Sequence, residues 1–351
     1  MNKENEILYF GKSLKTARKM AGLSMDDLAN IMGRIVTKQA IGKYELGKMK
    51  PTSKVIIRLA QALKVKPEYF FRSSVIELSQ LNFRKRFKFR KNIEESLKYK
   101  TIDLLERYKE LEEILGLSIK FEEPFLKCNI KNQNDVEQAA ENLRRKWGLG
   151  NTPIMYLLKF LEEKGIKILF MDNFDGFDGL SADVGDTKII VLNKSHPPDR
   201  LRFTAAHELA HILCKFPGNS KTEKLCHSFA GAFLLPKEVM EKVLLNKRSQ
   251  ITFWELKVLK ENYGISMQAI MNRAYDLDII SENYLQNFKA YMRKKNWRKE
   301  EPVKYCGKEE PFRFKQLLFY AVSEEIISFS KAADLWNMSI SEFREEFQAE
   351  L

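Results

Sequence analysis

The sequence predicts a mainly α-helical protein that carries one small β-sheet and divides into more than one domain. Apolar residues recur at helical spacing through residues 1–72, which is typical of an all-α bundle. Residues 134–174 fit the order helix, helix, strand, and residues 179–193 end in the alternating, β-branched run KIIVLN. The length of 351 residues exceeds what one hydrophobic core usually organises, so we expect two or three domains.

Composition excludes several classes of protein. With 44% hydrophobic and 30% charged residues, the chain is typical of a soluble globular protein. No apolar run approaches the roughly 20 residues that a membrane span needs, so no membrane partner is expected. The first residues, MNKENEILYF, lack the basic and then apolar layout of a signal peptide, which indicates a cytoplasmic protein. The four cysteines contain no CxxC pair and are predicted to be reduced, buried thiols: Cys128, Cys214, Cys226 and Cys306.

The positive charge is concentrated at one end of the chain. The net charge is +13, and residues 1–72 hold 15 Lys and Arg against 6 Asp and Glu. A basic end on an otherwise nearly balanced chain favours a polyanionic partner, although a face kept basic for solubility would show the same charge.

Residues 1–72 are predicted to form a helix-turn-helix domain. Two short helices joined by a turn at Gly33 form the unit whose second helix enters the major groove of DNA. The stretch GLSMDDLANIMG, followed by TKQAIGKYELGKMKPTSKVIIRLAQAL, resembles the phage-repressor (Xre/Cro-like) class over the whole domain. Four helices are expected over 11–23, 24–33, 37–48 and 51–65, with Ser24 and Thr37 as N-caps.

This resemblance implies double-stranded operator DNA as a partner and places the DNA contacts at the start of the second helix. Gln can make two hydrogen bonds with adenine, Lys can reach guanine or phosphate, and Ala can touch a thymine methyl group. Domains of this class usually bind paired half-sites as dimers, so a homodimer is one expectation. The alternative is a DNA-binding fold reused for protein contact. The expected DNA-binding residues are Lys38, Gln39, Ala40 and Lys43.

Residues 73–117 are predicted to be a basic linker followed by a long helix. The basic and aromatic run RKRFKFRK precedes a charged stretch with Ile, Leu and Tyr at helical spacing. We favour a linker that packs against the following domain, and contact of RKRFKFRK with phosphate is the alternative.

The central part of the chain carries a metal-binding pattern in RFTAAHELAHIL (202–213). His207 and His211 are four residues apart on a predicted helix, so both imidazoles project from one face, and Glu208 lies beside them as a general base. Zinc proteolysis needs three protein ligands and an open position for water, whose pKa the metal lowers to roughly 7. The segment TEKLCHSFAGAFLLP follows on its own helical pattern, and Glu223 and His227 face the same side of it.

RFTAAHELAHIL together with EKLCHSFAGAFLLP resembles the ImmA/IrrE family of zinc metallopeptidases. The resemblance implies a zincin-like α+β metallopeptidase domain over residues 118–245. It assigns Zn²⁺ to His207, His211 and Glu223, and it makes Glu208 the catalytic base. His227 stands where the family usually has Asn or Asp. We expect it to steady a ligand or an oxyanion, and the alternative is that it competes with Glu223 for the metal.

Residues 246–351 are predicted to be a helical C-terminal region. Its first part, 253–284, turns at Gly264 and resembles a second helix-turn-helix-like unit that follows the peptidase core in this family. Residues 293–314 are polar and predicted to form an ordered loop, and 314–347 two or three amphipathic helices.

Together, these features predict a DNA-binding, zinc-dependent endopeptidase. The resemblance implies that it cleaves a helix-turn-helix transcriptional repressor and so relieves repression. The alternative from another class is a non-cleaving helix-turn-helix transcription regulator or antitoxin whose zinc domain senses or binds a partner. A third reading is autoproteolysis near residues 73–92, which would release the basic end. A degenerate peptidase fold that binds metal or nothing is the structural alternative.

Overall fold

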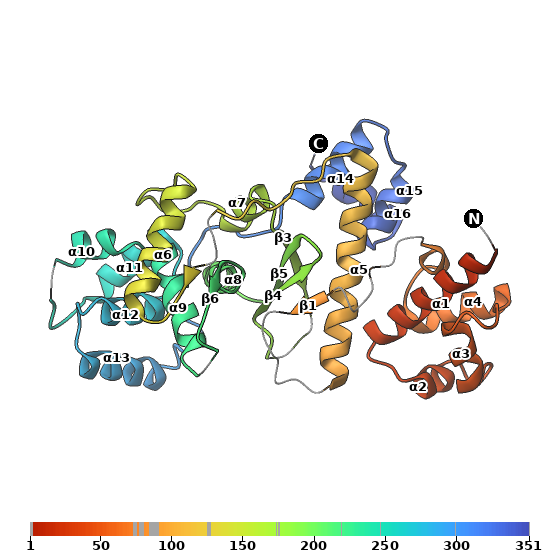
Figure 1. Cartoon of the computed structure of the whole chain (residues 1–351), viewed down its shortest axis with the longest axis horizontal. Helices are drawn as coiled ribbons and strands as arrows, with labels where there is room; N and C mark the ends of the chain where they lie inside the picture. The colour runs from red at the N-terminus through yellow and green to blue at the C-terminus, as the bar shows by residue number, and fades with distance from the viewer. Residues whose placement is uncertain are drawn as a thin grey trace. The chain divides into compact units, whose positions relative to one another are not determined.

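The computed structural model describes residues 3–72, 76, 81–83, 91–124, 128–172, 174, 176–218, 220–245, 247–298 and 300–350 (Figure 1). The chain groups into two compact units. Unit 1 comprises Met1–Asn82, Arg86–Ser118 and Gln316–Leu351, and unit 2 comprises Phe83–Lys85 and Ile119–Lys315. The chain therefore leaves unit 1, builds unit 2, and returns to unit 1 with its last residues.

The N-terminal part of unit 1 is a bundle of short helices whose ends carry the predicted signals. Ser24 and Asp27 form a capping box at the start of the second helix, and Thr37 Oγ1 accepts the backbone N–H of Ala40 at the start of the third. Both caps are therefore confirmed, whereas the first helix begins at Lys3 and not at residue 11. The elements are α1 (Lys3–Met20), α2 (Met25–Ile31), α3 (Lys38–Glu45), α4 (Ser53–Leu63) and the 3-10 helix η1 (Pro67–Phe71).

A small apolar core and one buried ion pair hold this bundle together. Leu14, Leu28 and Ile41 are fully buried in the core. The Arg18 guanidinium binds the Glu45 carboxylate through two hydrogen bonds of 2.6 and 2.9 Å, and both side chains are 3% exposed. Because a buried charge is tolerated only when it is paired, this contact fixes α1 against the end of α3.

The rest of unit 1 is built around the long helix α5 (Lys91–Leu115), which packs against α1 and α15. Of the basic run RKRFKFRK, residues 84–90 lie outside the described residues, and α5 begins at its last lysine. In Figure 1 the C-terminal helices gather at one end of α5. These helices are α14 (Arg313–Ser323), α15 (Phe329–Trp336) and α16 (Ile340–Ala349).

Polar contacts join α15 to the N-terminal bundle and to α5. Lys66 Nζ lies 2.5 Å from Asp334 Oδ1, and the Arg107 guanidinium donates to the Leu335 carbonyl at 3.3 Å. The last residues of the chain therefore belong to the same compact unit as the helix-turn-helix. The predicted division into four parts, with boundaries at residues 72, 117 and 245, remains a prediction. It does not group residues 316–351 with the N-terminal helices, as the structure does.

Unit 2 contains a small mixed sheet in which β5 lies between β4 and β3. β4 runs antiparallel to β5, with Leu180 opposite Val191, and β3 runs parallel to β5, with Leu169 opposite the same valine. Residues 189–193 of β5 are all buried, as expected for a strand covered on both faces. The bounds are β1 (Leu81–Phe83), β3 (Lys167–Met171), β4 (Gly179–Val184) and β5 (Thr187–Asn193); β2 (Cys128–Asn129) and β6 (Cys214–Lys215) form a separate parallel pair.

Helix α8 packs on the sheet and is itself the most buried helix of unit 2. This helix contacts β4 and β5 as well as α9, and α9 also packs against α6 and α12. Gly264, at φ 60°, ends α11, and the Ser266 side chain caps α12, which confirms the predicted pair of helices. The helices are α6 (Gln133–Lys146), α7 (Leu157–Glu163), α8 (Pro198–Leu213), α9 (Thr222–Leu234), α10 (Lys237–Leu244), α11 (Phe253–Tyr263), α12 (Met267–Asp276) and α13 (Glu282–Lys294). Throughout the described ranges, the helices lack the combination of length and apolarity that spanning a bilayer requires.

Candidate functional site

The histidine pair lies on α8, which is buried on nearly all sides. Pro198 is its first residue, where a missing N–H costs nothing, and its flanking Leu, Ile and Ala side chains fill the core of unit 2. His207 and His211 are 6% and 9% exposed, and Glu208 is 2% exposed. Burying three ionisable side chains among apolar neighbours is unfavourable unless they find polar partners. Packing alone therefore does not explain these residues.

The neighbouring helix α9 brings a carboxylate to both histidines. Glu223 Oε2 lies 3.4 Å from His207 Nε2, and Glu223 Oε1 lies 3.8 Å from His211 Nε2. The predicted ligand set is therefore brought together in space, from residues on two different helices. Its role as a ligand set stays a prediction.

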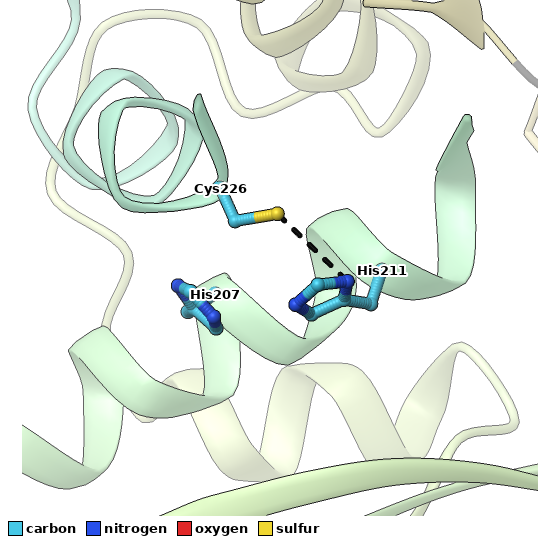
Figure 2. Close-up of side chains that lie close together, drawn as sticks. All are labelled: His207, His211 and Cys226. Atoms are coloured by element: carbon cyan, nitrogen blue, oxygen red, sulfur yellow. Dashed lines mark hydrogen bonds between the residues drawn. The ribbon is translucent and has the colours of Figure 1, made fainter. Parts of the chain in front are cut away.

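A fourth donor, Cys226, lies on α9, the helix that carries Glu223, and its thiol points toward the histidine pair (Figure 2). Figure 2 shows His207 and His211 projecting from α8, with the Cys226 thiol directed toward them. Cys226 Sγ lies 3.8 Å from His211 Nδ1. The ligand atoms of His207, His211 and Cys226 all lie within 4.8 Å of one another. The sequence predicts Cys226 only as a buried thiol, because one cysteine outside a CxxC pair has no ligand spacing by which a metal site could be recognised.

His227 is placed beside the cluster and is exposed at the surface. Its ring centroid is 4.5 Å from that of His207, and its Nδ1 lies 2.6 Å from the backbone carbonyl oxygen of Glu223. His207, Glu223 and His227 form a second group whose ligand atoms lie within 4.8 Å of one another. The contact with the Glu223 backbone fits a supporting role, and the distances also suit the alternative in which His227 binds the metal.

The glutamate of the HELAH pattern is held by the sheet. Ser181, on β4, donates a hydrogen bond of 2.8 Å from its Oγ to Glu208 Oε2, and the serine is fully buried. This bond orients the carboxylate next to the histidine pair. Ser181 lies 27 residues before Glu208, and sequence analysis assigned it no role.

The donors present fit a zinc ion. Zinc binds imidazole nitrogen, thiolate sulfur and carboxylate oxygen in four-coordinate sites, and a catalytic site uses three protein ligands and leaves one position open. Two imidazoles from α8 and one carboxylate from α9 face one another here. They lie close enough to bind a common ion with the two helices as they are placed. The donor set therefore fits a metal ion that prefers nitrogen, sulfur and oxygen ligands, as zinc does.

A cavity of about 1020 Å³ adjoins the cluster on the side of His227. Phe203, His227 and Asp276 contribute to its lining. Burial raises the pKa of the Asp276 carboxyl, and the Ser228 hydroxyl, which donates to it at 2.7 Å, opposes that shift. The volume is that of a typical small-ligand site and could also take the side chains of a peptide.

Buried ion pairs connect the segments around this cavity. The Lys260 ammonium binds Asp199 at 2.6 Å and Glu301 at 2.7 Å. Arg202 on α8 pairs with Glu309, and both side chains are 1% exposed. Removing either partner of such a pair would leave a buried charge without compensation, so these residues stabilise the walls of the site.

The predicted DNA-binding residues lie on the outer face of unit 1. Lys38, Gln39 and Lys43 are exposed and Ala40 is partly exposed, all on α3, whereas Ile41 and Tyr44 of the same helix are buried. The Thr37 cap fixes the start of α3, which is the end that enters a major groove in helix-turn-helix proteins. Contact of these side chains with DNA stays a prediction.

Comparison with known proteins agrees with both halves of this description. Residues 161–275 match the model of the M78 peptidase family, described as the IrrE N-terminal-like domain, and residues 14–70 match a helix-turn-helix model. The chain thus contains, in this order, a segment similar to helix-turn-helix domains and a segment similar to the M78 peptidase family. Both resemblances predicted from the sequence are thereby confirmed, and the matched peptidase segment contains the side chains that could hold a metal ion.

One relative among the curated proteins is described as a regulator of transcription. It is YonR of Bacillus subtilis (strain 168), described as an SPbeta prophage-derived, uncharacterized helix-turn-helix-type transcriptional regulator. The two are 34% identical over 65 residues, which are 18% of this chain and 58% of the relative. The match thus spans little more than half of the relative's length, and it supports the helix-turn-helix assignment.

Proposed function

We propose that the protein is a DNA-binding, zinc-dependent endopeptidase that cleaves a helix-turn-helix transcriptional repressor. The observation that carries the proposal is the meeting of Glu223 with His207 and His211, at 3.4 and 3.8 Å, beside a glutamate held by Ser181. Three ligands and a positioned carboxylate are the parts that zinc proteolysis requires.

In this proposal His207, His211 and Glu223 hold the zinc ion, which when bound supplies Lewis acidity for the attack of water on a peptide carbonyl. Glu208 accepts the proton of the attacking water on its carboxylate and passes it to the leaving amide nitrogen. The Ser181 hydroxyl keeps that carboxylate aimed at the cluster. His207, Glu208 and His211 are buried among the side chains around α8, whereas the Glu223 side chain is 44% exposed, so the attacking water has access from the α9 side.

The helix-turn-helix domain would bring the peptidase to its substrate. Lys38, Gln39, Ala40 and Lys43 would read operator DNA to which a repressor is also bound. Tethering two partners to one DNA segment raises their effective concentration to about the millimolar range. The repressor substrate is proposed because a DNA-bound protein of the same class is the one that this tethering favours.

The test compares new protein N-termini in cells that express the wild-type chain, Glu208→Gln or Glu261→Gln. Glu208→Gln keeps the size of the side chain but removes the proton acceptor, and Glu261→Gln is a matched change at an exposed position of α11. We expect termini within a helix-turn-helix protein for the wild type and Glu261→Gln, and their loss in Glu208→Gln. Termini that are identical in all three strains would favour the non-cleaving regulator, in which the metal domain senses or holds a partner.

A further inference from the structure

Two cysteines that are far apart in the sequence face each other at the end of α8. Strands β2 and β6 run parallel, and their register places Cys128 directly opposite Cys214. The two sulfur atoms are 2.9 Å apart. Cys214 follows Leu213, the last residue of the helix that carries both histidines. The pair therefore lies at the edge of the proposed metal site without being part of it.

The two thiols have different surroundings. Cys128 is half-buried, whereas Cys214 is 6% exposed. The hydrogen bond from Cys214 lowers the pKa of the Cys128 thiol, because it stabilises the thiolate. The same contact, together with burial, raises the pKa of the Cys214 thiol. Cys128 is thus the more acidic and more accessible member of the pair, which are the two properties that make a cysteine reactive toward oxidants.

We propose that Cys128 and Cys214 are a reversible oxidation site, in which Cys128 reacts with hydrogen peroxide and Cys214 then closes a disulfide with it. Opposite positions on neighbouring strands lie roughly 4.8 Å apart, within the range of about 4.4–6.8 Å between Cα atoms that a disulfide spans, and the two sulfur atoms already lie 2.9 Å apart. The other two cysteines do not fit this role, since Cys226 faces the histidines and Cys306 is exposed.

The chemistry balances with peroxide as the only added reactant. The Cys128 thiolate attacks one peroxide oxygen, an S–O bond forms, the O–O bond breaks, and the departing hydroxide takes up a proton to give water. Cys214 then loses its proton and attacks the sulfenic sulfur, and the hydroxyl group leaves with that proton as a second water. Two thiols lose two electrons, and one peroxide is reduced to two waters. A dithiol or glutathione reverses the bond by exchange.

This inference goes beyond the proposed proteolysis and does not depend on it. The disulfide would fasten the end of the metal-bearing helix to a residue 86 positions earlier in the chain. It would form in a protein with or without peptidase activity.

Peroxide treatment of the purified full chain, followed by tryptic digestion without reductant, tests the proposal. We expect a cross-linked species that joins CNIK (128–131) to FTAAHELAHILCK (203–215), identified by mass spectrometry. Reductant should abolish the species, Cys128→Ser should prevent it, and Cys306→Ser should leave its yield unchanged. In Cys214→Ser, which lacks the second thiol, dimedone should label Cys128 as a sulfenic acid.

Two results would overturn the proposal. One is the absence of the cross-link in the wild-type chain at a peroxide dose that oxidises the exposed Cys306, which serves as an internal control for the oxidant. The other is a cross-link that pairs either peptide with Cys226 or Cys306. Dimedone labelling of Cys214 in Cys128→Ser at the rate seen for Cys128 would reject the assigned order of attack.

Discussion

Ser181 Oγ donates a hydrogen bond of 2.8 Å to Glu208 Oε2, so a strand of the sheet holds the carboxylate of the HELAH pattern. The contact links the fold to the proposed chemistry. A general base is effective only when its carboxylate is aimed at the proton that it removes, and here the aim comes from β4 and not from the helix that carries the glutamate.

We predict that Ser181→Ala lowers the rate of substrate cleavage without lowering metal content. A hydrogen bond to a charged group contributes about 1.5–3 kcal/mol, so the expected loss in kcat is about tenfold or more. The measurement is kcat on an identified substrate beside metal content by atomic absorption. Ser323→Ala, on the exposed side of α14, is the control. Loss of metal together with activity would show that Ser181 builds the metal site and does not position the base.

We predict that Glu223→Ala weakens zinc binding far more than His227→Ala does. Glu223 contacts both histidines, whereas His227 contacts the Glu223 backbone and the His207 ring. Loss of a residue that only supports ligands typically costs about 10–100-fold in metal affinity. Competition with a chromogenic chelator measures the affinity. Equal losses in the two variants, or a larger loss in Cys226→Ser, would change the assignment of the third ligand.

We predict that Lys38→Ala and Gln39→Ala each weaken specific binding to operator DNA by about 1–3 kcal/mol. The reason is that both side chains are exposed at the start of α3, where base edges are read. Fluorescence anisotropy at fixed salt with the operator and with a scrambled duplex gives the measurement. Lys237→Ala, an exposed lysine of unit 2, is the matched control. An unchanged preference for the operator in both variants would place the recognition surface elsewhere.

We predict that the stability of unit 2 falls between about pH 4.5 and 7 because of Glu162. Burial raises the pKa of Glu162 from 4.5 to about 7, although its Oε2 accepts the backbone N–H groups of Phe312 and Arg313. Because the folded-state pKa lies above the unfolded value, this contribution to stability is complete below pH 4.5, falls while only the unfolded carboxyl is ionised, and is lost once the pH rises through about 7.

Glu162→Gln should remove this part of the pH dependence, which amounts to about 3 kcal/mol. Urea titrations of the metal-free chain at pH 4.5, 6 and 7.5 measure it, and Glu163→Gln, at the exposed neighbour, should behave as the wild type. If the difference in unfolding free energy between Glu162→Gln and the wild type is the same at all three pH values, the assigned titration is wrong.

Local features of this protein could be predicted from its sequence. Ser24 and Thr37 were identified as caps because capping depends on residues within one turn, and His207 and His211 share a face because helical periodicity alone places them there. The strand 187–193 likewise follows from its local run of β-branched residues, TKIIVLN. The pairing of Glu223 with the histidines came from a resemblance to a known family.

Contacts between distant segments could not be predicted in this way. Ser181 reaches Glu208 only because β4 packs on α8, and Cys128 meets Cys214 only because two very short strands pair. The same holds for Lys66 and Asp334, which are 268 residues apart. Such contacts depend on how elements pack, and no periodicity within one segment encodes the partner of a side chain in another.

Residues 316–351 belong to unit 1, and this determines what cleavage of the chain by itself near residues 73–92 would do. Because α1 packs on α5, and Lys66 and Arg72 bind Asp334 of α15, a single nick between residues 73 and 92 would leave both fragments associated through non-covalent contacts. Such a nicked chain would run as two bands on a denaturing gel and as one species in gel filtration. Scission of the polypeptide and dissociation of the DNA-binding part are therefore separate events in this architecture.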